Sequence, residues 1–177
     1  MKPFFLLAMS SLFIVYACNN AETNGNNNDS SSVSTNESSS SGSNNSGANN
    51  SNNVVSKKGL PLSPKQEVPA NNSPASGTAD VSYNKDNHML TYTINWTGLT
   101  DKPIMSHIHG TAGKGANAGV KHDFSNLLPK TTSGNFSDSV KVDGTTIKED
   151  SLLAGFYYIN IHTPKNQGGE IRGQIEF

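Results

Sequence analysis

The chain has 177 residues, a net charge of −1 and no basic cluster, so its charge gives no reason to expect binding to nucleic acid or to an anionic membrane surface. A single cysteine excludes an intramolecular disulfide. The composition is uneven along the chain, and the regions are therefore taken in order.

The N-terminus is typical of an exported protein. Lys2 precedes a largely apolar run of 14 residues, Phe4 to Ala17, which is too short to span a bilayer but suits a signal peptide. The run ends in "VYAC", where Ala17 and Cys18 resemble a bacterial lipobox. We therefore expect residues 1–17 to be a signal peptide and Cys18 to carry lipid that anchors the chain to the cell or outer membrane. An ordinary signal peptide followed by an unmodified cysteine is the alternative.

The next segment predicts a tether. Residues 19–58 contain 13 Asn and 12 Ser in 40 positions and no aromatic residue. Such a segment cannot bury enough apolar surface to offset the entropy lost on ordering. We expect residues 18–58 to form the lipidated Cys18 plus a disordered linker, whose length of 40 residues corresponds to a coil of roughly 35 Å. The linker would hold a folded domain, residues 59–177, clear of the lipid headgroups.

Strands are predicted throughout this domain, because hydrophobic residues alternate with period two. The clearest case is "MLTYTINWTGL", in which one apolar face alternates with a Thr/Asn face. The segment "SGTADVSY" before it alternates in the same way, and the turn residues 84–88 between the two predict a hairpin. An edge strand is expected within Leu60–Pro69, since its prolines cannot donate hydrogen bonds to a sheet.

Five further strands are expected, at Ile104–Gly110, Gly119–Phe124, Gly134–Val142, Gly155–Thr163 and from Gly169 to the C-terminus. One short helical turn is expected within Thr145–Gly155, with Leu152 and Leu153 facing the core. Short antiparallel strands separated by turns predict an all-β sandwich or barrel.

Polar residues gather on one face of three of these strands. His107 and His109 share a face in "MSHIHG", and Asn160 and His162 share one in "YINIHT". The closing "GEIRGQIEF" has Glu170 and Arg172 on its polar face. A short loop joins the last two segments and predicts an antiparallel pair, which would bring these polar residues together.

Two interpretations of this polar face are open. In the first, three histidines bind Cu or Zn: His107, His109 and His162. His122 would add a fourth ligand if the glycine-rich loop folds back, and Glu170 or Asn160 would orient a ligand ring through its second nitrogen. In the second, the histidines form hydrogen bonds with Glu170, Asn160 and backbone carbonyls, and the face meets water.

The sequence gives little support for phosphate binding or for nucleophilic catalysis. The loop "HGTAGKGANAGV" lacks the G-x-x-x-x-G-K-[ST] pattern of a phosphate-binding loop, and we interpret it as a turned connection with Lys114 exposed to solvent. The chain has no G-x-S-x-G motif and no serine recognisably paired with a histidine. We therefore name no catalytic residue and expect a non-enzymatic protein.

Several segments, in this order, resemble the chordin-type (CHRD) domain family: "LSPKQEVP", "ASGTADVSY", "LTYTINWTGL", "SHIHGTAG", "GFYYINIHT" and "GGEIRGQIEF". The resemblance covers nearly all of residues 60–177. It implies an antiparallel, immunoglobulin-like β-sandwich of Greek-key type in an extracytoplasmic setting, and it gives no established activity. It also marks the motif positions His107, His109, Asn160, His162, Glu170 and Arg172.

The segment "HIHGTAGKGANAGVKHDF" resembles the copper-ligand region of copper–zinc superoxide dismutases, in which an H-x-H strand leads into a loop with a further histidine. The cysteine pair of that family is absent, and five histidines cannot also supply its zinc cluster, so no catalytic residue is carried over. The expected function is a lipid-anchored, extracytoplasmic binding or structural module whose partner the sequence does not name. The alternative is a Cu- or Zn-binding protein, in its most specific form one similar to superoxide dismutase.

Overall fold

The computed structural model describes residues 53–177. The predicted signal peptide, Cys18 and the part of the predicted linker up to residue 52 lie outside the described residues. Within residues 53–177, no helix is long and apolar enough to cross a membrane.

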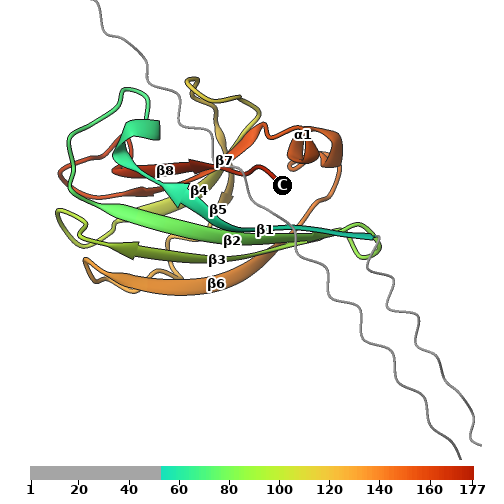
Figure 1. Ribbon diagram of the computed structural model, residues 1–177, viewed down its shortest axis with the longest axis horizontal. Helices are drawn as coiled ribbons and strands as arrows, with labels where there is room; N and C mark the ends of the chain where they lie inside the picture. The colour runs from blue at the N-terminus through green and yellow to red at the C-terminus, as the bar shows by residue number, and fades with distance from the viewer. Residues whose placement is uncertain (1–52) are drawn as a thin grey trace, which may run out of the picture. The chain divides into compact units, whose positions relative to one another are not determined.

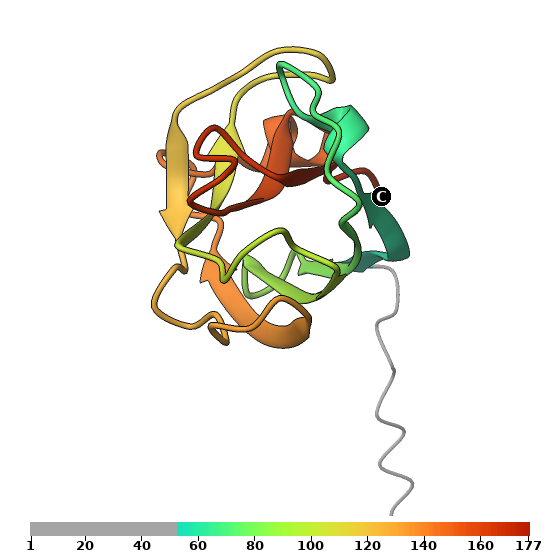
Figure 2. The ribbon, with the colours of Figure 1, turned by 90° about the vertical axis from the view of Figure 1, so that its left-hand side faces the viewer.

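Within residues 53–177, eight strands form two antiparallel sheets that pack face to face (Figure 1). The first sheet has the order β1 (Val54–Leu62), β2 (Ser76–Asn84), β3 (Met89–Thr97), β6 (Gly134–Lys141). The second has the order β5 (Val120–Asp123), β4 (Met105–Gly110), β7 (Tyr157–His162), β8 (Ile171–Gln174). The chain leaves the first sheet after β3 and returns beside β3 as β6, which is a Greek-key connection. Figure 2, turned by 90°, shows the two layers from their end. The predicted antiparallel β-sandwich is confirmed.

The predicted hairpin is formed by β2 and β3, which pair from Ser76 opposite Thr97 to Asn84 opposite Met89. The apolar face of β3 lies in the core, where Leu90, Tyr92, Ile94 and Trp96 are each at most 3% exposed. Burial of this face fixes the register, because a slip of one residue would turn all four side chains to solvent.

The first strand begins earlier than expected. Val54 and Val55, placed in the linker by composition, pair with Asn84 and Tyr83 of β2. These two β-branched residues favour a strand, but they follow a long Asn/Ser-rich segment, and the composition of that segment assigned them to the linker. β1 is an edge strand, as predicted, but it ends at Leu62, before Pro64 opens a short 3-10 helix, η2 (Pro64–Gln66).

The predicted helical turn is α1 (Glu149–Leu153). Leu152 is fully buried, whereas Leu153 is 37% exposed, so the expectation that both leucines face the core is wrong. Successive residues of an α-helix are about 100° apart, and a helix of this length offers only one of the two to the core.

The second sheet packs closely against the end of β1. A Cβ atom on Gly173 would lie 2.7 Å from the Pro61 carbonyl oxygen and 2.9 Å from Cδ1 of Leu62, so only glycine fits there. Ser63 then bridges to Arg172 of β8. This contact carries the segment after β1, with Glu67, onto the outer side of β8.

Connecting segments cover the outer face of the second sheet and shield it from solvent. The loop of residues 111–119 accepts a hydrogen bond from Arg172 at Ala116 O, and its Asn117 donates to Val68 O in the segment after β1. The loop after β7 adds Gln167 O. The polar side chains beneath are at most 9% exposed: His107, His109, Asn160, His162, Arg172 and Gln174. The expectation that this face meets water is therefore wrong, whereas the expected contacts of histidines with backbone carbonyls and with Asn160 are present.

Candidate metal centre

The pairing of β4 with β7 brings three histidines to one place. His107 lies opposite Asn160, Met105 opposite His162, and His109 opposite Tyr158. One ring nitrogen from each of His107, His109 and His162 lies within 4.8 Å of the others. Side-chain shifts of about 1 Å would place all three nitrogens about 2.0–2.1 Å from a single ion, the usual Zn–N distance. The predicted convergence of these rings is present in the structure.

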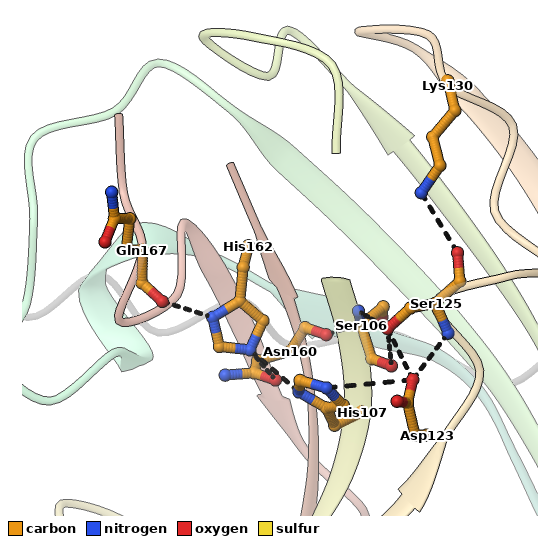
Figure 3. Close-up of polar contacts among 8 residues, drawn as sticks. All are labelled: Ser106, His107, Asp123, Ser125, Lys130, Asn160, His162 and Gln167. Atoms are coloured by element: carbon orange, nitrogen blue, oxygen red, sulfur yellow. Dashed lines mark hydrogen bonds and ion pairs between the residues drawn. The ribbon is translucent and has the colours of Figure 1, made fainter. Parts of the chain in front are cut away.

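Two backbone carbonyls fix the protonation pattern of two rings. The Nδ1 atom of His162 lies 2.9 Å from Gln167 O (Figure 3), and Nδ1 of His109 lies 2.8 Å from Ala118 O. Because a carbonyl oxygen only accepts hydrogen bonds, each Nδ1 is the donor and carries the proton. In the neutral rings, the Nε2 atoms of His109 and His162 are therefore unprotonated. An unprotonated ring nitrogen has a free lone pair and can bind a metal.

The Nε2 atom of His109 is buried and has no hydrogen-bond partner within residues 53–177. Native proteins rarely leave a buried acceptor unpaired, since its lost hydration costs about 1–3 kcal/mol. The rings of His107 and His162 lie close by, with centroids 5.2 and 6.2 Å from that of His109. A bound cation would satisfy the Nε2 acceptor of His109.

His107 lies between His162 and a carboxylate. Its Nδ1 is 3.1 Å from His162 Nε2, and its Nε2 is 3.8 Å from Asp123 Oδ1 on β5 (Figure 3). Since His162 Nε2 is an acceptor, the proton of His107 lies on Nδ1 when the two rings share a hydrogen bond. Metal binding at Nδ1 requires the other tautomer, in which the Nε2–H group faces Asp123. The carboxylate favours that tautomer, as carboxylates beside metal-bound histidines do.

Asn160 contacts a ligand atom of the cluster, which differs from its expected role at the second nitrogen of a ring. Its Oδ1 lies 3.0 Å from His162 Nε2 and the residue is 2% exposed. Both atoms are acceptors in this arrangement, so the contact is favourable only when the amide is turned or a cation lies between them. The amide oxygen of Asn160 is thus a fourth potential metal ligand.

Burial lowers the pKa of all three histidines, and for His162 the value falls to about 4. For His107 and His162, the neighbouring histidines lower the pKa further. For His109, the hydrogen bond with Ala118 O and the neighbouring Asn160 amide partly oppose the effect of burial on the pKa. All three rings are therefore neutral at pH 7 and able to act as ligands.

His122 does not belong to the cluster, so its proposal as a fourth ligand is wrong. It lies opposite Ile108, whose side chain is in the core, and therefore on the face of the sheet opposite to His107 and His109. Its Nε2 approaches Asp138 Oδ2 of β6 at 3.5 Å. The glycine-rich loop does fold back as the prediction required, but it contributes the carbonyl of Ala118 and not His122.

Glu170 does not orient a histidine either. Its buried carboxylate accepts hydrogen bonds from Ser73 Oγ at 2.5 Å, Thr163 Oγ1 at 2.5 Å, and the N–H and hydroxyl groups of Thr100 at 2.7 and 2.9 Å. These donors come from three separate connections. The role of Glu170 is to join them, and the predicted role at a ligand ring is wrong.

Arg172 positions His109 indirectly. Its guanidinium lies 3.4 Å from the centre of the Tyr158 ring, whose other neighbour is the His109 ring, stacked at 4.9 Å and 3°. Arg172 also donates to Ala116 O and Asn117 Oδ1, in the loop that supplies Ala118 O to His109. The stack and the loop together hold the His109 ring in place.

The fold and this site define the chain as an all-β sandwich with a buried polar cluster on one sheet. A family model described as the CHRD domain matches residues 59–175, and the chain belongs to this family. No match was found among curated proteins or among solved structures. Membership of this family supports a role for the domain as a binding or structural module.

Proposed function

We propose that the domain is a metal-binding module that holds a Cu or Zn ion through His107, His109 and His162. The observation that carries the proposal is the buried Nε2 lone pair of His109, which has no hydrogen-bond partner within residues 53–177 and lies close to the two other rings. Neutral imidazole is a preferred ligand of both metals. The backbone carbonyls on two rings and Asp123 beside the third are the kind of outer contacts that orient metal-bound histidines.

Metal content and thermal stability test this proposal on the purified full chain. After loading with Zn(II) or copper and desalting, we expect near-stoichiometric metal and a higher melting temperature. Ligand at 100 times its dissociation constant stabilises a protein by about 2.7 kcal/mol, which a melting curve resolves readily. The variant with both His107→Ala and His109→Ala should lose the metal and the shift.

The matched control is His88→Ala, because His88 is exposed in the turn between β2 and β3 and lies outside the cluster. This variant should bind metal as the wild type does. Absence of near-stoichiometric Zn or Cu in the wild type, together with no thermal shift for either metal, would show that the cluster is only a hydrogen-bonded polar core.

We also propose that the module is exported and tethered to a membrane through lipid on Cys18. The proposal is supported by the apolar run that ends in "VYAC" and by the Asn/Ser-rich segment that follows it. Two or more acyl chains would anchor the chain stably, whereas one would not.

Mass spectrometry of the mature protein tests the anchor. We expect an N-terminal residue Cys18 with the added mass of its acyl chains, and partition of the protein into detergent. Cys18→Ser should abolish both the added mass and the partition. An unmodified mature chain that begins after Cys18 would contradict the proposal.

A further inference from the structure

One more potential ligand lies on the strand that carries His107 and His109. Met105 is the first residue of β4, two positions before His107, and alternate residues of a strand share a face. Ser106 and Ile108, the residues between, are fully buried on the inner side. Met105 therefore lies on the same outer face as the two histidines, and its side chain is 37% exposed.

The strand pairing also places Met105 beside the third histidine. Met105 is directly opposite His162 in the register of β4 and β7, and Ile104 N donates to His162 O at 2.9 Å. Directly opposed residues have Cβ atoms about 4.5–5.5 Å apart and on the same side of the sheet. The long, flexible methionine side chain thus starts next to His162 at the solvent-exposed end of the cluster.

The thioether sulfur of Met105 distinguishes the two candidate metals. A thioether is a soft ligand that selects Cu(I), whereas zinc sites use thiolate, imidazole and carboxylate groups. The other potential ligands are neutral, so they do not offset the charge of the ion. The guanidinium of Arg172 lies near the cluster, 3.4 Å from the centre of the Tyr158 ring that stacks on His109. Burial of a charge is costly, and a monovalent ion carries less of it than a divalent one.

We propose that the histidine cluster is a Cu(I) site and that Met105 is its exposed ligand, which contacts the ion at the surface of the domain. This inference rests on the proposed metal-binding function and specifies the metal.

The test is a competition between the purified full chain and a chromogenic Cu(I) chelator under anaerobic conditions. Met105→Leu keeps the size and apolar character of the side chain and removes only the sulfur. We expect it to weaken Cu(I) binding by at least about tenfold, since even the loss of a group that only orients a ligand costs about 10–100-fold in affinity. Zn(II) affinity should not change. Met89→Leu, at the start of β3 in the other sheet, is the matched control and should bind Cu(I) as the wild type does.

X-ray absorption of the Cu(I)-loaded wild type gives a second measurement that does not depend on how the variant folds. We expect a copper–sulfur contribution that is absent from Met105→Leu. Cu(I) binding without this contribution, or unchanged by Met105→Leu, would overturn the role of Met105 while leaving the histidine site intact. Preference for Zn(II) over Cu(I) would overturn the choice of metal alone. A wild-type chain that binds neither ion would instead overturn the proposed function itself.

Discussion

Glu170→Ala is expected to lower the free energy of unfolding by about 3–5 kcal/mol, because several donors lose a charged acceptor and each hydrogen bond to a charged group contributes about 1.5–3 kcal/mol. The carboxylate is fully buried, and its loss leaves the donors of Ser73, Thr100 and Thr163 without their acceptor. These residues belong to three connections that no strand pairing joins. Urea unfolding of metal-free protein at pH 7 measures the difference.

The control for Glu170→Ala is Glu176→Ala, because Glu176 forms an exposed ion pair with Lys114 at 2.8 Å. Exposed pairs contribute about 0–1 kcal/mol, so this variant should resemble the wild type. An equally small loss for Glu170→Ala would mean that the three connections are held by other contacts.

The pH dependence of this effect has a defined sign. Burial acts to raise the pKa of Glu170, but the hydrogen bonds from Ser73, Thr163 and Thr100 outweigh it, and the pKa is lowered. Stability from a carboxyl group with a lowered pKa is present above the pKa of the unfolded chain and is lost as the pH falls. The difference between wild type and Glu170→Ala should therefore shrink below about pH 4.5, the ordinary pKa of a glutamate.

The strands and the three clustered histidines could be predicted because both depend on local alternation. Period two in "SHIHG" and "YINIHT" assigns His107, His109 and His162 to one kind of face without knowledge of the partner strand. A short loop to the closing strand then predicts that Asn160 lies beside Arg172, and these two residues are opposed in the structure.

The errors arise where a residue's position depends on register or on a loop. His122 lies on the wrong face for the cluster because the pairing of β4 with β5 places it opposite Ile108, and a shift of one residue reverses the face. Glu170 precedes the first residue of β8 and follows Gly169, which has a φ of +127°, so alternation within β8 does not describe it.

The groups that orient the histidines were also beyond prediction. Two of them are the backbone carbonyls of Ala118 and Gln167, which carry no signal in the sequence because every residue has a carbonyl. Asp123 does have a signal, since it alternates with His122 in "GVKHDF", but only the pairing of β5 with β4 places it opposite His107. These contacts depend on how the loops cover the sheet.

Glu67→Gln is expected to stabilise the domain at neutral and alkaline pH, in contrast to the loss expected for Glu170. Glu67 is 5% exposed, and its Oε1 has no hydrogen-bond partner in the described part of the chain. Burial raises its pKa to about 7, although the nearby charge of Arg172 acts in the opposite direction. The folded state therefore binds this proton more tightly than the unfolded state, whose glutamate has a pKa of 4.5.

The sign follows from this difference. The favourable contribution of the protonated group is complete below pH 4.5 and is lost as the pH rises through about 7, so the wild type loses up to about 3 kcal/mol over this range. The glutamine side chain of the variant cannot ionise and avoids the loss. Urea unfolding of metal-free wild type and Glu67→Gln should give similar stabilities near pH 4.5 and the largest gain for the variant at pH 8. Glu176→Gln, at an exposed position, should show no such gain. A Glu67→Gln protein less stable than wild type at pH 8 would mean that the ionised carboxylate is held by Arg172 more strongly than burial opposes it.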